Sequence, residues 1–329
     1  MMNRNRDEQD DGAQRPQSDR EWKLIEKLVL SMQDEQRKQR RWSIFFRFAT
    51  LAYMVLLLLL ILPLRTGVPQ PKASEPHTAM VKISGMIAED RESSADKIAG
   101  GLRRAFEAEH SEAVLLRINS PGGSPVQADY AFREIRRLRD EHPEKKVYAV
   151  ITDVGASGAY YIASAADEIY VAPSSIVGSI GVVMGGFGFV ESIEKLGMER
   201  RIFTAGEDKD MLDPFAPLEE EHVEHAGRML EQVHQHFIDA VREGRGDRLD
   251  EDHPNLFTGR IWTGDDSVEM GLADAFGSPG QVARDVIGQE EIVDYTVYPH
   301  PFQRFMRGMG ASIGEGLGRV MGLERWQLR

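Results

Sequence analysis

Ser157 lies in a turn of small residues, DVGASGAYYIASAAD at 153–167, where its hydroxyl could act as a nucleophile. The turn follows an apolar run at 146–152, and Gly158 comes directly after the serine. A turn from a strand into a helix can place a hydroxyl beside free N–H groups that stabilise an oxyanion. A serine at the start of a helix is also a common N-cap, so the turn alone leaves both roles open.

A serine nucleophile needs a base, and no histidine lies between His142 and His222. Five later histidines are candidates by elimination: His222, His225, His234, His236 and His253. The first four fall in an acidic helical stretch, where we expect histidines to face solvent. The HQH triplet in that stretch has no third ligand at a zinc spacing, so the sequence predicts no metal site.

Lysine is the other side chain that pairs with serine as a base. After Ser157 the chain has thirteen arginines but only two lysines, Lys195 and Lys209. Arginine keeps its proton in proteins, whereas a desolvated lysine can lose it. Lys195 stands four residues after Glu191, the spacing of a helical ion pair, which leaves Lys209 as the candidate base.

The surroundings of Lys209, TAGEDKDM, also suit an ordinary charged loop. To act as a base near neutral pH, its amine must have a pKa of about 7–8 instead of ~10.4. Three acidic neighbours, Glu207, Asp208 and Asp210, would raise that pKa if they gathered around the amine. The mechanism therefore predicts that Lys209 is buried and that its acidic neighbours point away.

Two glycine-rich stretches lie between the expected strands and helices. NSPGGS, residues 119–124, contains Gly122 and Gly123, which would let backbone N–H groups approach a ligand as in an oxyanion hole. A plain turn is the alternative for this stretch. The stretch 174–189 does not fit the Gly-x-Gly-x-x-Gly fingerprint of dinucleotide sites, and we predict no cofactor.

Short apolar runs alternate with helical patterns from residue 79 to residue 173, which predicts an α/β fold with a mostly parallel, buried sheet. We expect strands at 79–84, 113–119, 146–152 and 168–173, and helices at 95–109, 125–141, 157–166 and 219–242. The formal charge of −13 argues against nucleic acid as a partner, and the absence of cysteine excludes disulfides and thiolate chemistry.

The N-terminal part of the chain carries a long apolar run, residues 48–64, that is preceded by RKQRR. The run is long enough for a membrane helix, and the basic flank would keep the N-terminus in the cytoplasm. We expect five segments: a cytoplasmic tail with an amphipathic helix (1–41), a transmembrane helix (42–64), a linker (65–77), a folded domain (78–296) and a C-terminal tail (297–329).

Four motifs in order resemble the signal peptide peptidase A family of membrane-anchored serine–lysine peptidases: NSPGGS, GASGAYYIASAADEIYVAPSSIVGSIGVVM, EKLGMERRIFTAGEDKDM and FTGRIWTGDDSVEMGLADAFG. The resemblance implies that Ser157 is the nucleophile, that Lys209 is the general base and that Ser179 orients the lysine. It also implies that the N–H groups of Gly123 and Gly158 hold the oxyanion.

The same resemblance implies the spiral of ββα units of the Clp peptidase and crotonase superfamily. It implies a homo-oligomer with composite active sites, anchored in a bacterial inner membrane with its catalytic domain in the periplasm. The expected substrates are remnant signal peptides or other hydrophobic segments. Three alternatives stay open: a related quality-control protease, an acyl-CoA enzyme on the same fold, and a membrane-tethered scaffold without catalysis.

Overall fold

The computed structural model describes residues 22, 26, 27, 30, 38–57 and 74–298. The chain divides into two units, Met1–Pro69 and Gln70–Arg329. In the first unit, residues 38–57 are helical. No helix among the described residues is both long and apolar enough to cross a membrane.

Several predictions fall on parts of the chain that the structure does not describe. The last seven residues of the expected membrane helix, 58–64, lie outside the described residues. The same is true of most of the expected amphipathic helix at 21–36 and of all but two residues of the tail at 297–329.

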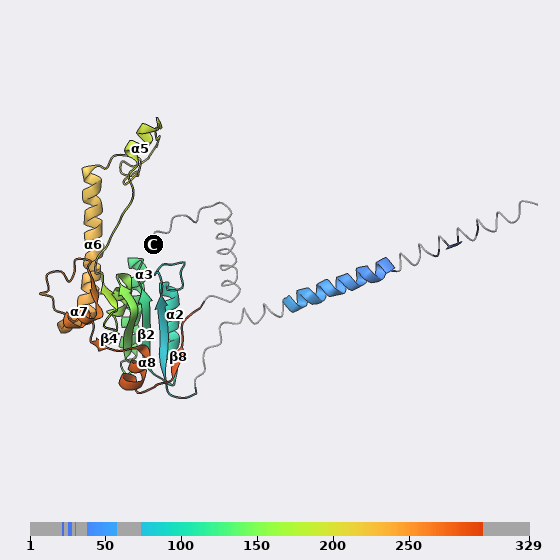
Figure 1. The fold of residues 1–329 in the computed structure, drawn as a ribbon, viewed down its shortest axis with the longest axis horizontal. Coiled ribbons are helices and arrows are strands. Elements are labelled where there is room, and N and C mark those ends of the chain that lie inside the picture. The colour runs from blue at the N-terminus through green and yellow to red at the C-terminus, as the bar shows by residue number, and fades with distance from the viewer. Residues whose placement is uncertain (1–21, 23–25, 28–29, 31–37, 58–73, 299–329) are drawn as a thin grey trace, which may run out of the picture. The chain divides into compact units, whose positions relative to one another are not determined.

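The second unit contains eight strands: β1 (His77–Ser84), β2 (Ser111–Ser120), β3 (Val147–Ala156), β4 (Glu168–Val171), β5 (Ile176–Gly178), β6 (Ile261–Thr263), β7 (Ala275–Phe276) and β8 (Ile292–Asp294). They form one sheet in the order β6-β5-β3-β2-β1-β8, and β4 pairs with β3 and β7 (Figure 1). Every pair is parallel except β5 with β6. The predicted α/β fold with a largely parallel sheet is confirmed.

The helices of this unit are α2 (Ala95–Glu107), α3 (Pro125–Glu141), α4 (Gly158–Ala163), α5 (Val190–Lys195), α6 (Glu220–Arg245), α7 (Gly264–Glu269) and α8 (Pro279–Gln281). A 3₁₀ turn at Gly246–Arg248 and a π-helical turn at Val282–Ile287 complete the set. Helix α3 has the predicted bounds, because Pro125 fits the first helical position and the Ser124 hydroxyl accepts a hydrogen bond from the Gln127 N–H.

The main core lies between the sheet and helices α2, α3, α4 and α6. Alternate residues of β2 point to opposite faces, so Val114, Leu116 and Ile118 join the main core while Leu115 packs with a smaller cluster on the other face. All four side chains are fully buried. Both faces of the central strands are therefore covered, as the continuous apolar runs in the sequence require.

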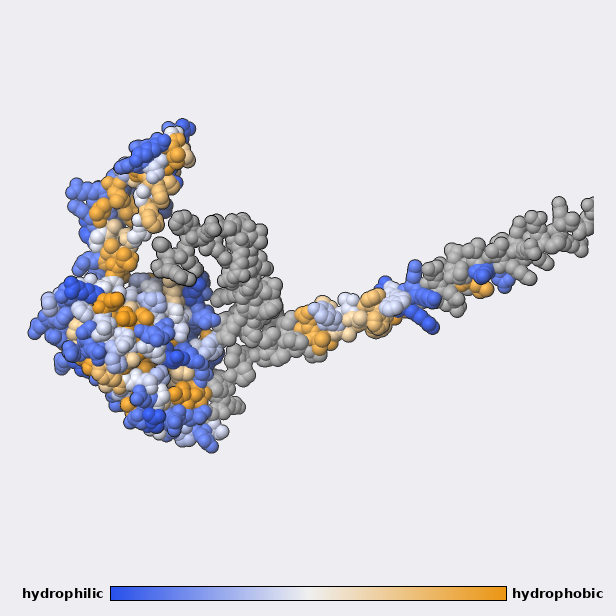
Figure 2. Space-filling model, viewed as in Figure 1, coloured by the Kyte–Doolittle hydropathy of each residue, from blue (hydrophilic) through white to orange (hydrophobic). Residues whose placement is uncertain are grey.

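Residues 182–219 form an arm that leaves the body of this unit together with the N-terminal half of α6. Figure 1 shows α5 at the far end of this arm, beside the start of α6. The two chain segments of the arm meet where the Phe189 N–H donates to the Pro214 carbonyl. Apolar side chains stand out on the arm in Figure 2, and Phe203 and Val183 are 95% and 91% exposed.

Candidate active site

Ser157 occupies the single residue between the end of β3 and the start of α4. Its φ and ψ are 53° and −128°, a conformation that costs a non-glycine residue of order 1–3 kcal/mol. The Ser157 N–H donates to the Gly178 carbonyl at 2.8 Å, which holds the turn in place. The side chain makes no capping hydrogen bond to α4, so the N-cap role that the sequence left open is not the one this serine has.

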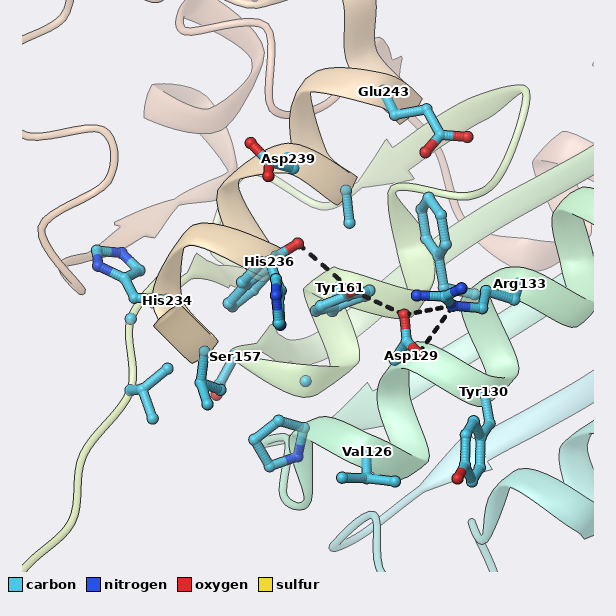
Figure 3. A pocket seen from close by; sticks show the side chains of 18 of the residues that line it. Val126, Asp129, Tyr130, Arg133, Ser157, Tyr161, His234, His236, Asp239 and Glu243 are labelled. Atoms are coloured by element: carbon cyan, nitrogen blue, oxygen red, sulfur yellow. Dashed lines mark hydrogen bonds and ion pairs between the residues drawn. The ribbon is translucent and has the colours of Figure 1, made fainter. Parts of the chain in front are cut away.

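Ser157 lines a cleft of about 1430 Å³ between α3 and α6. Figure 3 shows the residues of α3, among them Val126 and Asp129, on one side of the cleft and those of α6 on the other. Gly123, Gly158 and Ser179 line the same cleft. The structure therefore brings together four of the five predicted site residues.

Ser179 reaches the cleft because β5 pairs with β3. In the register of this pair Ala156 lies opposite Gly178, so the next residues, Ser157 and Ser179, leave the sheet side by side. Ser179 also has a positive φ, 52°, and its N–H donates to the Arg260 carbonyl at 2.7 Å. Two serines at equivalent strand ends are thus each held in an unusual backbone conformation beside one cleft.

The loop of Gly122 and Gly123 packs directly against the Ser157 turn. A Cβ atom on Gly123 would lie 2.1 Å from the Ile87 carbonyl oxygen, so only glycine fits there. A Cβ atom on Gly158 would lie 3.4 Å from the Gly123 nitrogen, which places these two backbone N–H groups close together. Gly158 is the first residue of α4, and its N–H therefore has no partner within the helix. Two N–H donors thus lie beside the serine.

Tyr161 holds helix α4, which follows Ser157, between α3 and α6. Its hydroxyl lies 3.1 Å from Asp129 Oδ1 and 3.4 Å from the His236 carbonyl oxygen, and its ring stacks on Phe237 at 4.9 Å. Burial raises the pKa of Tyr161 well above its usual value, with the Asp129 carboxylate adding to the effect. The phenol therefore stays protonated and acts as a donor that fixes α4, not as a base.

Two histidines of α6 line the cleft, and one of them, His234, departs from the expectation that it faces solvent. His234 is half-buried, with Nε2 3.1 Å from the Ile180 carbonyl oxygen, whereas His236 is exposed but also borders the cleft. The sequence contained the signal for His234, because it stands three and four residues before the buried Phe237 and Ile238. The expectation that these histidines face solvent rested on the acidic composition of the stretch and did not use this helical spacing.

The remaining histidines lie elsewhere. His253 packs edge-on against Trp262, with ring centroids 5.2 Å apart, and His225 is exposed. His222, in the first turn of α6, contacts Asp208 in the arm. In the described part of the chain, no group of three His, Asp or Glu side chains could hold a metal ion.

Lys209 is exposed on the arm and does not line the cleft. The neighbouring Asp208 contacts His222 at 3.1 Å, and His222 is 14 residues before His236 on α6, a distance of about 21 Å along the helix. The prediction that Lys209 is buried beside Ser157 is therefore wrong within a single chain. The physical reason is the arm, which carries residues 182–219 away from the body. Lys195 pairs with Glu191 at 3.1 Å, as predicted.

Residues 139–291 match the family described as Peptidase family S49. A Brucella abortus protein named Na(+)/H(+) antiporter NhaA is 44% identical over 224 residues, which cover 67% of this chain and 30% of that protein. A putative protease of Methanocaldococcus jannaschii is 30% identical over 222 residues, covering 65% of this chain and 70% of that protein.

A protein of Enterococcus faecium named putative signal peptide peptidase SppA is 27% identical over 234 residues, covering 68% of this chain and 67% of that protein. This chain thus spans less than a third of the Brucella relative but about two thirds of the two relatives that are named as a protease or a peptidase.

Proposed function

Because this chain belongs to peptidase family S49, the signal peptide peptidase A family, we propose that it is a serine endopeptidase whose nucleophile is Ser157 and whose base is Lys209 of a second copy. Ser157 Oγ attacks the carbonyl carbon of the scissile bond as Lys209 Nζ takes its proton. The same amine then protonates the departing amine of the substrate. Water attacks the acyl-enzyme in the second half of the reaction, again with Lys209 as base.

The other predicted residues have supporting roles in this mechanism. The N–H groups of Gly123 and Gly158 would donate to the oxyanion of each tetrahedral intermediate. The Ser179 hydroxyl would hydrogen-bond the incoming amine and orient it toward Ser157. The positions of these three residues around one cleft support the assignment.

The main support for the proposal is that Lys209 lies away from the cleft, whereas the other four predicted site residues line it. Helix α6 is continuous over 26 residues, so the arm cannot fold back onto its own cleft while that helix stays intact. The exposed Phe203 and Val183 leave the arm with apolar surface that a neighbouring copy would cover. A homo-oligomer in which the arm of one copy reaches the cleft of the next satisfies both requirements.

Complementation between inactive variants tests this proposal directly. Ser157→Ala and Lys209→Ala should each abolish cleavage of a fluorogenic peptide and keep the fold. When the two variants are assembled together in equal amounts, about a quarter of the sites regain an intact Ser157 and an intact Lys209 from different chains, and activity returns. Full activity of Lys209→Ala, or no recovery of activity when the two inactive variants are assembled together, would contradict the proposal.

We further propose that the chain acts at the periplasmic face of a bacterial inner membrane, on remnant signal peptides or other hydrophobic segments. The helix at 38–57 exposes Trp42, Phe45 and Phe46, which supports a membrane anchor. The Enterococcus relative is named a putative signal peptide peptidase, which supports signal peptides as the substrate class. The proposed fold of the catalytic domain is the Clp-like spiral of ββα units. Comparing the peptides that accumulate in membranes with and without active enzyme tests the substrate class.

The exposed position of Lys209 favours one second candidate, a membrane-tethered scaffold without catalysis. A related quality-control protease with other substrates would share the site and differ only in the peptides that accumulate. Labelling by a serine-reactive probe separates an enzyme from a scaffold, because only an active dyad would make labelling of Ser157 depend on Lys209.

A further inference from the structure

The side chain of Lys209 is free although acidic residues surround it in the sequence. Its turn is closed by hydrogen bonds from the Lys209 N–H to the Gly206 carbonyl at 3.3 Å and from the Met211 N–H to the Asp208 carbonyl at 3.1 Å. The lysine amine makes no hydrogen bond or ion pair with any residue that the structure describes. Three carboxylates, those of Glu207, Asp208 and Asp210, are close to this amine in the sequence and could pair with it.

One of these carboxylates, that of Asp208, is held by a different side chain, His222. The Asp208 Oδ1 atom lies 3.1 Å from Nε2 of His222, which is in the first turn of α6. The His222 side chain is only 12% exposed, although it lies on a narrow arm, whereas the Asp208 side chain is 72% exposed. The histidine is thus the more buried partner, and the contact holds the exposed carboxylate near α6.

The contact between His222 and Asp208 matters because Lys209, as the proposed base, must lose its proton. A carboxylate paired with the amine would favour its charged form and raise its pKa, and each unit of that rise makes the neutral amine about tenfold rarer below the pKa. His222 with a proton on Nε2 donates to Asp208 whether the ring is neutral or charged. The turn around Lys209 also contains Glu207 and Asp210. Further carboxylates stand at the start of α6: Glu219, Glu220 and Glu221.

We propose that His222 is a positioning residue for the base: it binds the Asp208 carboxylate and so keeps the Lys209 amine unpaired and ready to enter the neighbouring cleft. The inference rests on the proposed role of Lys209. His222 touches neither the substrate nor Ser157 and acts on the lysine only through the Asp208 side chain.

The first experiment measures the lysine amine without using catalysis. Full-length protein carrying Ser157→Ala is treated with an amine-reactive acylating reagent between pH 7 and pH 10, and modification of Lys209 is followed by mass spectrometry. Adding His222→Ala should slow this modification about threefold to tenfold at pH 8, because the freed Asp208 carboxylate pairs with the amine. His225→Ala is the matched control, one turn further along α6 and exposed, and should leave the rate unchanged.

Asp208→Asn separates positioning from a structural role. In the Asp208→Asn background His222→Ala should no longer slow the modification, because no carboxylate remains to pair with the lysine. The inference is overturned if His222→Ala does not slow the modification, or if it slows it equally in both backgrounds.

The second experiment tests the same residues in the active enzyme. The acidic limb of the pH profile of kcat/KM should move to higher pH in His222→Ala by about half a unit to one unit and return in the double variant. An unmoved limb would overturn the inference even if Lys209→Ala is inactive. Full activity of Lys209→Ala would instead refute the proposed function, while the acylation rates would still report on the contact between His222 and Asp208.

Discussion

His234 Nε2 lies 3.1 Å from the carbonyl oxygen of Ile180, so a side chain of α6 holds the loop that carries Ser179. A carbonyl oxygen can only accept, and Nε2 must therefore carry the proton. The other anchor of this loop is the hydrogen bond from the Ser179 N–H to the Arg260 carbonyl. These contacts hold the loop around Ser179, whose φ is positive.

Removing the His234 anchor should impair the site more than the fold. We expect His234→Ala to lower kcat about tenfold, since the loop that carries Ser179 loses one of its restraints, with little change in KM. His234→Gln keeps an N–H donor of similar reach and should recover part of the rate. Gln235→Ala changes the adjacent exposed residue and serves as the control. Steady-state kinetics measure these rates. Equal kcat values for wild type and His234→Ala would contradict the role of His234 in holding the loop that carries Ser179.

The strained backbone of Ser157 predicts that the site is built at a cost in stability. Ser157→Ala and Ser157→Gly both remove the hydroxyl, but only glycine adopts a φ of 53° and a ψ of −128° without steric penalty. We expect the free energy of unfolding of Ser157→Gly to exceed that of Ser157→Ala by about 1 kcal/mol. This difference should appear as a higher unfolding temperature. Differential scanning calorimetry of the two inactive variants measures this directly, and a less stable Ser157→Gly would show that the turn is unstrained.

The proposed oxyanion role of the Gly123 N–H predicts a loss of rate when Gly123 gains a side chain. In Gly123→Ala the new Cβ would overlap the Ile87 carbonyl oxygen, so the loop must shift and carry the Gly123 N–H away from Ser157. Displacing one such donor costs about 10²–10³ in kcat. Gly185→Ala is the matched control, because a Cβ there meets no atom within 4 Å. Wild-type kcat in Gly123→Ala would remove this glycine from the mechanism.

Much of the fold was predictable because its elements are long and strongly patterned. The bounds of α3 follow from Ser124 and Pro125, and the apolar runs of the central strands indicated a sheet covered on both faces. The strand β3 runs four residues beyond its predicted end, to Ala156, since the small residues before Ser157 give no periodic signal. Pairing with β5 and β2 extends the strand there, and that pairing is a tertiary effect.

The position of Lys209 was not predictable from the order of residues alone. The sequence selected Lys209 because it is the lysine without a structural partner, and the structure agrees that its amine is unpaired among the described residues. Burial was expected because a lysine base needs a lowered pKa, but the structure exposes Lys209 on the arm at 182–219. The direction of this arm depends on the continuous helix α6 and not on local propensity.

The last prediction concerns a buried ion pair that fixes the base of α6 to the sheet. The Arg245 side chain is fully buried and donates two hydrogen bonds to Asp274, at 2.8 and 2.9 Å. Burial alone would raise the pKa of Asp274, but hydrogen bonds from Arg245 and from the Ile169 N–H outweigh it and hold the pKa below its usual value. The ionised carboxylate therefore stabilises the fold above its unfolded pKa of about 3.9, and this stabilisation is lost as the pH falls through the lower folded value.

Arg245→Met should lower the free energy of unfolding by about 3–5 kcal/mol, because it leaves Asp274 without its main partner. In Asp274→Asn we expect a smaller acid-induced loss of stability between pH 5 and pH 2, since the titrating group is gone. Urea unfolding followed by tryptophan fluorescence at several pH values measures both effects. Arg133→Met breaks a pair whose arginine is 76% exposed and should cost less than about 1 kcal/mol. A similar loss in Arg133→Met and Arg245→Met would show that burial does not set the strength of the Arg245 pair.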